Sequence, residues 1–589
     1  MARLVVDPVT RVGGRLRIEA DITAGQVAQA WSSGTTFRGI ESLILGRDPR
    51  DAWMFAERIC GTCTGVHALA SVRAVERGFG ITIPKNARLI RNLLASTLAV
   101  RDHVLGFYVS QAPDWVDAKA ASTADPAAAS VLARGRSDWP QSSVEYFTGI
   151  RDRLAAVVGS NQPGPYGNGY WGHPAYRLSP AESLVVCAHG LEALDWQRRL
   201  MRIHTLLGGR DPHPQTYLVG GMALTPPWGG PPARRAREHP QIPERNAPDA
   251  LGIVGLTVIS DQLAAARTFV EQVLVPDVLG IAAAYPEWAT VGKGPGGFLS
   301  YGEYPEDEGA TPVLFLPQGR ILGGDLSKTA PVEHEHIAES AAHAWYSDAD
   351  GDSGLRLASD GATTPAPPAM PFNGLDGNGR YSWSKAPRYD GTPLETGPLA
   401  RMLVGYVNGQ ADVKSAVETA ATAIGNGPAA LFGTLGRVVA RALEAQVIAK
   451  HAAGWLWELR TNLDTGDLAV VDPSSWDPMS WPDHAEGWSL GEGPRGSVGH
   501  WVTIADRVVK RYQVVDATTW NASPRDGSGT AGPLEAALVG TRVSDPAQPL
   551  ELLRVVHSFS PCAACAVHAF DPAGAGPVGI HVRSQERVR

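Results

Sequence analysis

The sequence predicts an α+β fold that is predominantly helical, with a central bundle of long helices and small β-sheets at its periphery. Long stretches with apolar residues at helical spacing are joined by polar or Pro/Gly-rich connections, which is typical of a helical bundle. Short alternations of apolar and polar residues near both ends indicate strands. No compositional break divides the 589 residues, so we expect one compact, multi-layered body.

The first elements are expected to be a small sheet and an interrupted helix. Two stretches within the first 35 residues, 15–22 and 26–31, alternate like paired strands. Residues 51–59 are expected to form a short helix, Gly61 to interrupt it, and residues 66–77 to resume it.

A long helix is expected to begin at Pro84. Its apolar stripe, at helical spacing, consists of Ile90, Leu94, Leu98 and Leu105. Asp102 continues that stripe, and a carboxylate on an apolar face is costly unless it is paired. From the residues alone, Asp102 is expected to form a structural ion pair with an arginine, and His103 to be a hydrogen-bonded core histidine.

Further helical patterns complete the predicted bundle. They cover residues 145–159, 179–207, 258–284, 396–424 and 429–459. Two irregular stretches, 226–248 and 347–379, are rich in Pro, Gly and charged residues. Both are expected to be long surface loops.

The C-terminal part is expected to return to strands and then to a last helix. Residues 501–504 and 508–515 have the pattern of a hairpin. Before it, residues 493–496 read Gly-Pro-Arg-Gly, which is typical of a rigid turn. Ser560 and Pro561 are expected to start the last helix as its N-cap and first residue.

Composition excludes some partners. The net charge is −8 and no Lys/Arg block occurs, so nucleic acid is not an expected partner. The five cysteines do not suggest a disulfide framework, and Cys187 is expected to be a small core residue in a chain that folds where thiols stay reduced. We expect neither a transmembrane segment of about 18 apolar residues nor a signal peptide.

The other four cysteines form two Cys-x-x-Cys pairs at opposite ends of the chain: Cys60 with Cys63, and Cys562 with Cys565. Such a pair at a helix start holds two sulfurs together and favours thiolates. Four thiolates suit zinc, an iron–sulfur cluster, nickel or copper. The pairs are much farther apart than the roughly 15–20 residues of a zinc ribbon, and a redox disulfide needs one pair near a βαβ unit. The spacing therefore favours a metal site.

Eight motifs occur along the chain in a fixed order. They are residues 7–11, 38–41, 58–67, 167–174, 385–390, 494–496, 518–526 and 561–568. Two of them read Arg-x-Cys-Gly-x-Cys-x-x-x-His and Pro-Cys-x-x-Cys-x-x-His. Together they resemble the signature of the large subunit of nickel–iron hydrogenases, and the likeness covers almost the whole chain.

The resemblance implies the large-subunit fold of that family and a nickel–iron centre with carbon monoxide and cyanide on the iron. The implied nickel ligands are Cys60, Cys63, Cys562 and Cys565. Of these, Cys63 and Cys565 would also bridge to the iron.

The resemblance also implies roles around the metals. Pro494 and Arg495 would lie over the iron, Asp102 beside the centre, and Cys565 would take part in catalysis with Arg495 and Asp102. The reaction would be heterolytic cleavage of dihydrogen, with the proton taken by a cysteine thiolate or by Arg495.

A second cation site is implied. Glu41 and His568 would hold magnesium or a similar ion, together with a backbone carbonyl near Val514.

Electrons need a way out of the chain. Since no further cysteines are present for an electron relay, an iron–sulfur small subunit is an expected partner. Maturation endopeptidase and nickel-insertion proteins are expected as well.

The last segment, Ala569–Arg589, begins directly after His568 and has no helical stripe. A frayed terminus is the simpler interpretation. In the resembled family, however, a C-terminal extension is removed once nickel is in place, so we expect residues 1–568 to be the body of an unprocessed precursor and 569–589 its removable extension. Folding and maturation are expected in the cytoplasm, with the final location, cytoplasmic or membrane-associated with the small subunit, left open.

Two relatives are alternatives to an uptake-type enzyme. A dihydrogen-sensing regulatory protein usually lacks the C-terminal extension, which this chain has. The hydrogenase-derived quinone-site subunit of respiratory complex I has lost the nickel cysteines, which this chain keeps.

Two positions depart from the family pattern. Gly13 stands where the family has a proton-carrying glutamate, and Ser560 where it usually has aspartate before the last Pro-Cys. General acid–base transfer needs a titrating group within hydrogen-bond reach, which glycine lacks. We therefore expect a diverged member that binds its metals but moves protons by another path, through water, His67 or Glu19, or turns over slowly.

Overall fold

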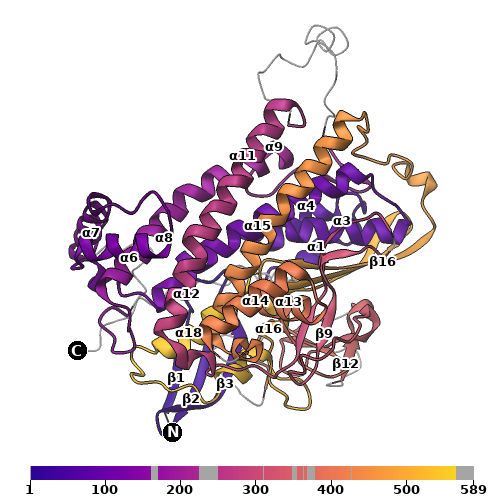
Figure 1. The fold of residues 1–589 in the computed structure, drawn as a ribbon. Coiled ribbons are helices and arrows are strands. Elements are labelled where there is room, and N and C mark those ends of the chain that lie inside the picture. Colours follow the sequence, from indigo (N-terminus) through magenta and orange to yellow (C-terminus); the bar gives the residue numbers. More distant parts are fainter. Residues whose placement is uncertain are drawn as a thin grey trace.

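A long helix, α15 (Thr434–Asp464), runs through the middle of the protein. Along it pack α4 (Lys85–Leu105), α11 (Ile253–Phe269) and α12 (Val275–Ala284), as Figure 1 shows. Almost every side chain in its first half is buried, because other elements surround that half on all sides. The prediction of a helix-rich fold with a central bundle of long helices is confirmed.

This computed structural model describes residues 2–160, 170–224, 250–309, 311–347, 354–361, 364–367, 379–425 and 427–564. The expected surface loop at 226–248 lies outside these ranges, as do most of 347–379 and the extension 569–589.

The remaining α-helices surround this bundle or link it to the sheets. They are α1 (Ile40–Ile44), α2 (Ala52–Ala56), α3 (Val66–Phe79), α5 (Ala118–Ala121), α6 (Pro126–Arg136), α7 (Val144–Gly159), α8 (Pro180–Leu200), α9 (Arg202–Gly208), α13 (Pro398–Val407), α14 (Ala411–Ile424), α16 (Ala517–Asn521), α17 (Pro533–Leu538) and α18 (Leu550–Ser558). The helices α6, α7 and α8 pack together at the left of Figure 1. One predicted helix, 396–424, is two helices, because the chain turns at Gly409 with a positive φ of 74°.

One helical segment, Ile253–Ala284, is long and apolar enough to cross a membrane by length and composition alone. It comprises α11, a π-helical turn at Val270–Leu274, and α12. Its apolar side packs on α15, and Asp277 is buried within the bundle. One face of the segment thus packs in the bundle, and 39% of its most apolar window is buried.

Two antiparallel three-stranded sheets carry most of the long strands. The first joins β1 (Ala2–Val6), β2 (Leu16–Thr23) and β3 (Gln26–Gly34), and the second joins β16 (His484–Gly493), β17 (Gly496–Ala505) and β18 (Val508–Val515). The predicted hairpin 501–515 is confirmed, and β16 is a third strand that the sequence analysis missed.

Shorter strands form small peripheral sheets. They are β4 (Tyr217–Leu218), β5 (Gly221–Met222), β6 (Phe298–Ser300), β7 (Glu303–Pro305), β8 (Leu314–Leu316), β9 (Gly319–Ile321), β10 (Ile337–Ser340), β11 (Tyr346–Ser347), β12 (Leu355–Leu357), β13 (Thr364–Pro365), β14 (Ala386–Tyr389) and β15 (Glu395–Thr396). Of these, β12 and β13 fall in the stretch that was expected to be a loop, so that expectation is wrong at these two strands.

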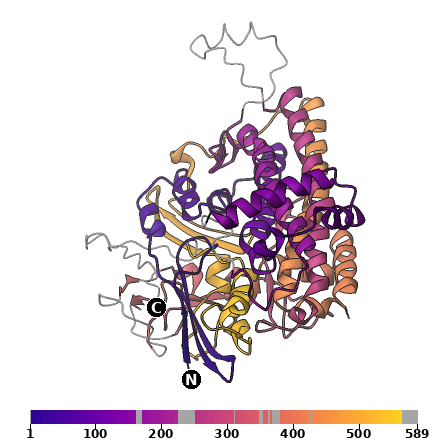
Figure 2. The same ribbon diagram turned by 90° about the vertical axis from the view of Figure 1, so that its left-hand side faces the viewer.

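The two ends of the described chain meet. Strand β3 hydrogen-bonds to the segment that follows α17, where the Val27 amide donates to the Thr541 carbonyl at 3.0 Å. Figure 2 shows the indigo N-terminal strands beside the yellow C-terminal helices. The residues of the N-terminal and C-terminal motifs are thereby brought to one place.

The prediction that Ser560 caps a new helix is wrong. Ser560 has a positive φ of 48° and its amide donates to the His557 carbonyl, so it lies at the C-terminal end of α18. Its hydroxyl accepts hydrogen bonds from Arg441 and Gln111 instead of from helix amides. The next residues run extended, and Cys562 pairs with Gly13 in a parallel β-bridge.

Candidate metal centre

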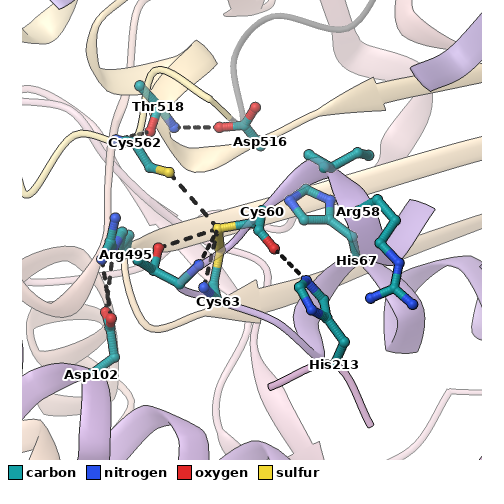
Figure 3. Close-up of a disulfide and its surroundings, with 12 residues drawn as sticks. Arg58, Cys60, Cys63, His67, Asp102, His213, Arg495, Asp516, Thr518 and Cys562 are labelled. Carbon is teal, nitrogen blue, oxygen red and sulfur yellow. Dashed lines mark hydrogen bonds and ion pairs between the residues drawn. A yellow bond between two sulfur atoms is a disulfide. The ribbon is translucent and has the colours of Figure 1, made fainter. Parts of the chain in front are cut away.

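Three cysteine sulfurs meet at the junction of the N- and C-terminal segments (Figure 3). Cys60 and Cys63 come from the turn between α2 and α3, and Cys562 from the extended segment after α18. The Sγ atoms of Cys60 and Cys562 are 3.8 Å apart. All three residues are buried, so the structure brings together the described members of the predicted nickel set.

The turn aims backbone donors at Cys60. The amides of Cys63 and Thr62 lie 3.1 and 3.4 Å from the Cys60 sulfur. Such donors stabilise a thiolate relative to a thiol. The expectation from the Cys-x-x-Cys spacing is therefore met in the local geometry.

Cys60 and Cys63 are joined as a disulfide in this structure, with their Cα atoms 5.6 Å apart. The sequence analysis expected reduced thiols here. A disulfide and a shared metal ion both require the two sulfurs to converge on one point, and the Cys-x-x-Cys turn provides that convergence. Metal binding requires the pair in its reduced, thiolate form.

Cys562 is held from two sides. Its amide donates to Thr518 Oγ1 at 2.9 Å, and the Thr518 amide in turn donates to the Asp516 carboxylate at 2.6 Å. On the other side, the Ala564 amide donates to the Gly13 carbonyl at 3.4 Å. An ideal Cβ at residue 13 would lie 2.5 Å from the Cys562 sulfur. A glycine at this position therefore allows the closest approach of the two segments.

A small cavity of about 20 Å³ lies beside these sulfurs. Its walls include Cys63, His67, Arg495, Asp516 and Cys562. The sulfur atoms suit a soft metal, and the Arg495 guanidinium can meet anionic ligands of that metal. The described residues thus fit the predicted centre in donor chemistry.

Arg495 lies at the tip of a tight hairpin. Pro494 and Arg495 form the two-residue connection between β16 and β17, where Gly493 pairs with Gly496. Gly496 has a φ of 141°, and a Cβ there would lie 2.4 Å from the Thr396 hydroxyl oxygen. The predicted rigid turn is confirmed, and it directs Arg495 into the cavity.

Asp102 pairs with Arg495, as expected for a carboxylate on the apolar stripe of α4. The guanidinium donates to both carboxylate oxygens, at 3.1 and 3.3 Å, and Arg441 lies 3.8 Å away. Burial alone would raise the pKa of Asp102, but the positive charges of Arg495 and Arg441 lower it to about 2. Asp102 is therefore ionised at every working pH.

Replacing Asp102 with asparagine is expected to lower the melting temperature of the protein near neutral pH. The pKa of Asp102 is about 2 in the fold and ordinarily 3.8, so its ionised form contributes stability that is present above 3.8 and is lost as the pH falls through 2. The difference in melting temperature between wild type and Asp102→Asn should be constant above about pH 5 and shrink below about pH 4. Calorimetry over that range measures it, and a difference that grew on acidification would contradict the ion pair.

His67 lines the cavity but is not poised to titrate. Its Nδ1 lies 3.0 Å from His500 Nε2, and His500 Nδ1 lies 2.7 Å from the Tyr512 hydroxyl. Burial lowers the pKa of His67 to about 3, so the ring is neutral near pH 7. It is a hydrogen-bonded link in a chain of rings.

Glu41 is half-buried near the same sheet. It accepts a hydrogen bond of 2.7 Å from the Val514 amide, and burial raises its pKa to about 8 despite the nearby Lys385. Glu339, paired with Lys385, adds a second carboxylate, and its Oε1 has no hydrogen-bond partner. The half-buried Glu41 carboxylate, the buried Glu339 carboxylate and its one unsatisfied oxygen fit a cation site.

Cys565 and His568 lie outside the residues that the structure describes. Within those residues, no group of three or more His, Cys, Asp or Glu side chains is arranged to hold a metal ion. The predicted nickel site includes Cys565, and the predicted magnesium site includes His568. The ligand roles of these two residues therefore stay predictions.

Comparison with known proteins decides the family. The model of the nickel-dependent hydrogenase family matches residues 38–568. The chain belongs to the nickel-dependent hydrogenase family. Family membership makes it an oxidoreductase that acts on dihydrogen, as its motifs predicted.

Relatives of this hydrogenase chain match over nearly full length. It is 43% identical to the uptake hydrogenase large subunit of Bradyrhizobium diazoefficiens, and 41% identical to the hydrogenase-1 large chain of Escherichia coli K12. Both alignments cover 99% of this chain and 97% of the relative. Among solved structures, the Ni-Fe-Se hydrogenase from Desulfovibrio vulgaris Hildenborough matches with a TM-score of 0.74 at 30% identity, over 96% of this chain and 100% of that one.

Sequence reasoning missed several groups around the centre. Asp516 and Thr518 hold the Cys562 segment, and His213 Nε2 lies 3.1 Å from the Cys60 carbonyl (Figure 3). Arg441 and Arg401 join the buried charges behind Arg495. Thr518 lies in the motif at 518–526, but that motif did not indicate its hydrogen bond with Cys562. No sequence pattern indicated the other four residues.

Proposed function

We propose that this chain is the catalytic large subunit of a nickel–iron hydrogenase that oxidises dihydrogen and passes the electrons to an iron–sulfur small subunit. The observation that carries the proposal is the convergence of three buried cysteine sulfurs beside a cavity that also receives Arg495. Four thiolates, with Cys565 as the fourth, form a ligand set suited to nickel.

In the proposed centre, Cys60, Cys63, Cys562 and Cys565 would hold nickel, and Cys63 and Cys565 would also hold an iron that carries carbon monoxide and cyanide. Pro494 and Arg495 line the cavity from the hairpin tip and would be the residues that meet those diatomic ligands. When bound, the centre supplies the redox chemistry by which dihydrogen is split into protons and electrons.

Residues of the chain itself orient the charged groups at the centre and accept the released proton. Asp102 keeps the Arg495 guanidinium charged and directed at the cavity, where its planar donors can meet anionic groups. The Val66 and Val498 side chains at the wall exclude bulk water and strengthen these electrostatic contacts. A cysteine thiolate, Cys565, is the proposed first acceptor of the released proton, because the Arg495 guanidinium that donates to Asp102 is already protonated.

A magnesium or similar ion is proposed next to Glu41, with His568 and the Val514 carbonyl as further ligands. Support comes from the raised pKa of the half-buried Glu41 and from the unsatisfied Oε1 of Glu339. The positive charge of such an ion would compensate carboxylates that burial otherwise disfavours.

The cysteine count supports an iron–sulfur partner. Outside the two pairs the chain has only Cys187, which is buried in α8. Iron–sulfur clusters are held by cysteine thiolates, and one cysteine cannot hold a cluster. The proposed small subunit supplies them.

Infrared spectroscopy of the complex with its small subunit tests the proposed centre. Bands of metal-bound carbon monoxide and cyanide are expected, together with nickel in metal analysis. Nickel-free protein without such bands, after expression with its maturation proteins, would overturn the proposal.

We expect the active enzyme to end at His568. The family match ends at that residue, and the extension 569–589 follows it directly. An endopeptidase acting after nickel insertion, in the cytoplasm, is the proposed agent. Intact-mass measurement of nickel-loaded, active complex should give a large subunit lacking residues 569–589; a mass that includes Arg589 would contradict this processing.

A further inference from the structure

The hairpin that carries Arg495 is held from behind by a buried arginine. Arg401, on α13, donates from one guanidinium nitrogen to the Pro494 carbonyl at 3.2 Å, directly before Arg495. Another nitrogen donates to the Glu492 carboxylate, at the end of β16. Arg401 therefore contacts both the backbone and a side chain of the hairpin.

The same guanidinium forms a fork on α15. Its Nε and one terminal nitrogen lie 2.9 and 2.7 Å from the two carboxylate oxygens of Glu444. Arg401 is 1% exposed and Glu444 is 1% exposed, so both charges depend on this pairing. Glu444 is in turn bound by His103.

Further contacts link Glu444 back to Arg495. His103 Nε2 lies 3.0 Å from Glu444, and His103 Nδ1 accepts a hydrogen bond of 3.1 Å from Arg441. Arg441 lies 3.8 Å from Asp102, which holds Arg495.

The chain of contacts is a closed ring around the hairpin tip. It passes from the Pro494 carbonyl through Arg401, Glu444, His103, Arg441 and Asp102 to Arg495. Its side chains come from α4, α13, α15 and the β16–β17 turn. Glu492, a further acid bound to Arg401, has its pKa raised to about 7 by burial.

Two small cavities of about 20 Å³ each lie beside the turn. One is lined by Arg401, Glu444, Glu492 and Pro494, and Pro494 also lines the cavity at the cysteines. The hydrogen bonds of Arg401 therefore reach the turn from the side of the first cavity, which no metal ligand named above lines.

We propose that Arg401 is a positioning residue that sets the aim of Arg495 at the metal centre, acting through the Pro494 carbonyl, Glu492 and the Glu444–His103–Arg441 contacts. The inference rests on the proposed nickel–iron centre. Arg401 does not line the cavity at the cysteines. A displacement of about 1 Å in a positioned group can cost up to about 100-fold in rate.

Arg401→Lys tests the role, because lysine keeps the charge but cannot form a fork on Glu444 while also binding Glu492 and Pro494. Its matched control is Arg91→Lys. Arg91 is equally buried, forms the same fork on Glu76 at 2.7 and 2.9 Å, and also donates to two backbone carbonyls, yet it lines neither cavity. Both variants should lose similar melting temperature.

Infrared spectra and kinetics of the full complex distinguish Arg401→Lys from Arg91→Lys. Arg401→Lys should shift the cyanide bands and lower kcat by about tenfold or more with little change in KM, whereas Arg91→Lys should leave both unchanged. Unshifted bands in Arg401→Lys, or equal shifts in both variants, would overturn the positioning role. A wild-type complex without such bands would instead overturn the proposed centre.

A second pair of variants tests the same role if the Arg401→Lys protein does not accumulate on expression. Glu444→Gln keeps the shape of the ring but weakens the fork, and Glu76→Gln makes the same change at the control pair. Shifted cyanide bands are expected in Glu444→Gln only. If both glutamine variants gave wild-type bands, the ring would not set the aim of Arg495.

Discussion

Replacing Cys562 with alanine is expected to abolish nickel retention. The Cys562 sulfur lies 3.8 Å from that of Cys60 at the wall of the cavity, so its loss removes one of four thiolates from the proposed site. Loss of an outer-shell partner alone costs about 10–100-fold in metal affinity, and loss of a ligand is expected to cost more. Cys562→Ser should also fail, because an alcohol oxygen is a poor ligand for a soft site.

Cys187→Ala is the matched control. Cys187 and Cys562 are both 2% exposed, but Cys187 lies within α8 and lines neither cavity. Nickel per protein should equal that of wild type in this variant, with only a small change in melting temperature. Equal nickel content in wild type and Cys562→Ala would remove Cys562 from the ligand set.

Much of the fold could be predicted because its signals are local. The apolar stripe of α4 and the alternation of β18 can be recognised from residues that are close in sequence, and both elements are present. Asp102 is the best example: a carboxylate on an apolar stripe demands a cation, and Arg495 supplies it. Local periodicity and the need to pair a buried charge were sufficient there.

Other features depend on contacts between distant segments. Ser560 has the sequence pattern of an N-cap, yet Arg441 binds its hydroxyl at 2.7 Å and its backbone ends α18 instead. Tertiary contacts overrode the local preference. Arg401 and Glu444 had no signal for the same reason, since their pairing joins α13 to α15 across the core.

The structure shows that the substitution Gly13→Glu, which the sequence suggests as a test, has a second effect. The sequence analysis attributes slow or rerouted proton transfer to the lack of an acid here, so Gly13→Glu should restore it. An added Cβ, however, would lie 2.5 Å from the Cys562 sulfur, and that sulfur must move. Gly13→Glu therefore changes two things at once, the carboxylate and the position of a proposed nickel ligand.

The alternative carriers named from the sequence do not replace that acid directly. Glu19 is ion-paired with Arg3 and Arg17 on β2 and does not line the cavity at the cysteines. His67 does line it, but with a pKa of about 3 it stays neutral near pH 7, and its Nδ1 is hydrogen-bonded to His500. A carboxylate at residue 13 would add a titrating group beside the sulfurs.

Gly13→Ala separates the two effects, because it adds the Cβ without the acid. We expect Gly13→Glu to exchange dihydrogen with deuterium at least about tenfold faster than Gly13→Ala, at equal nickel content, since a positioned general acid or base contributes about 10²–10⁴-fold. Isotope exchange followed by mass spectrometry, normalised to nickel, measures the ratio. Equal rates in the two variants would show that proton transfer at this position does not limit turnover. The chain's route would then run through water or through His67, and His67→Ala, which interrupts the link to His500, should slow exchange in the wild-type background.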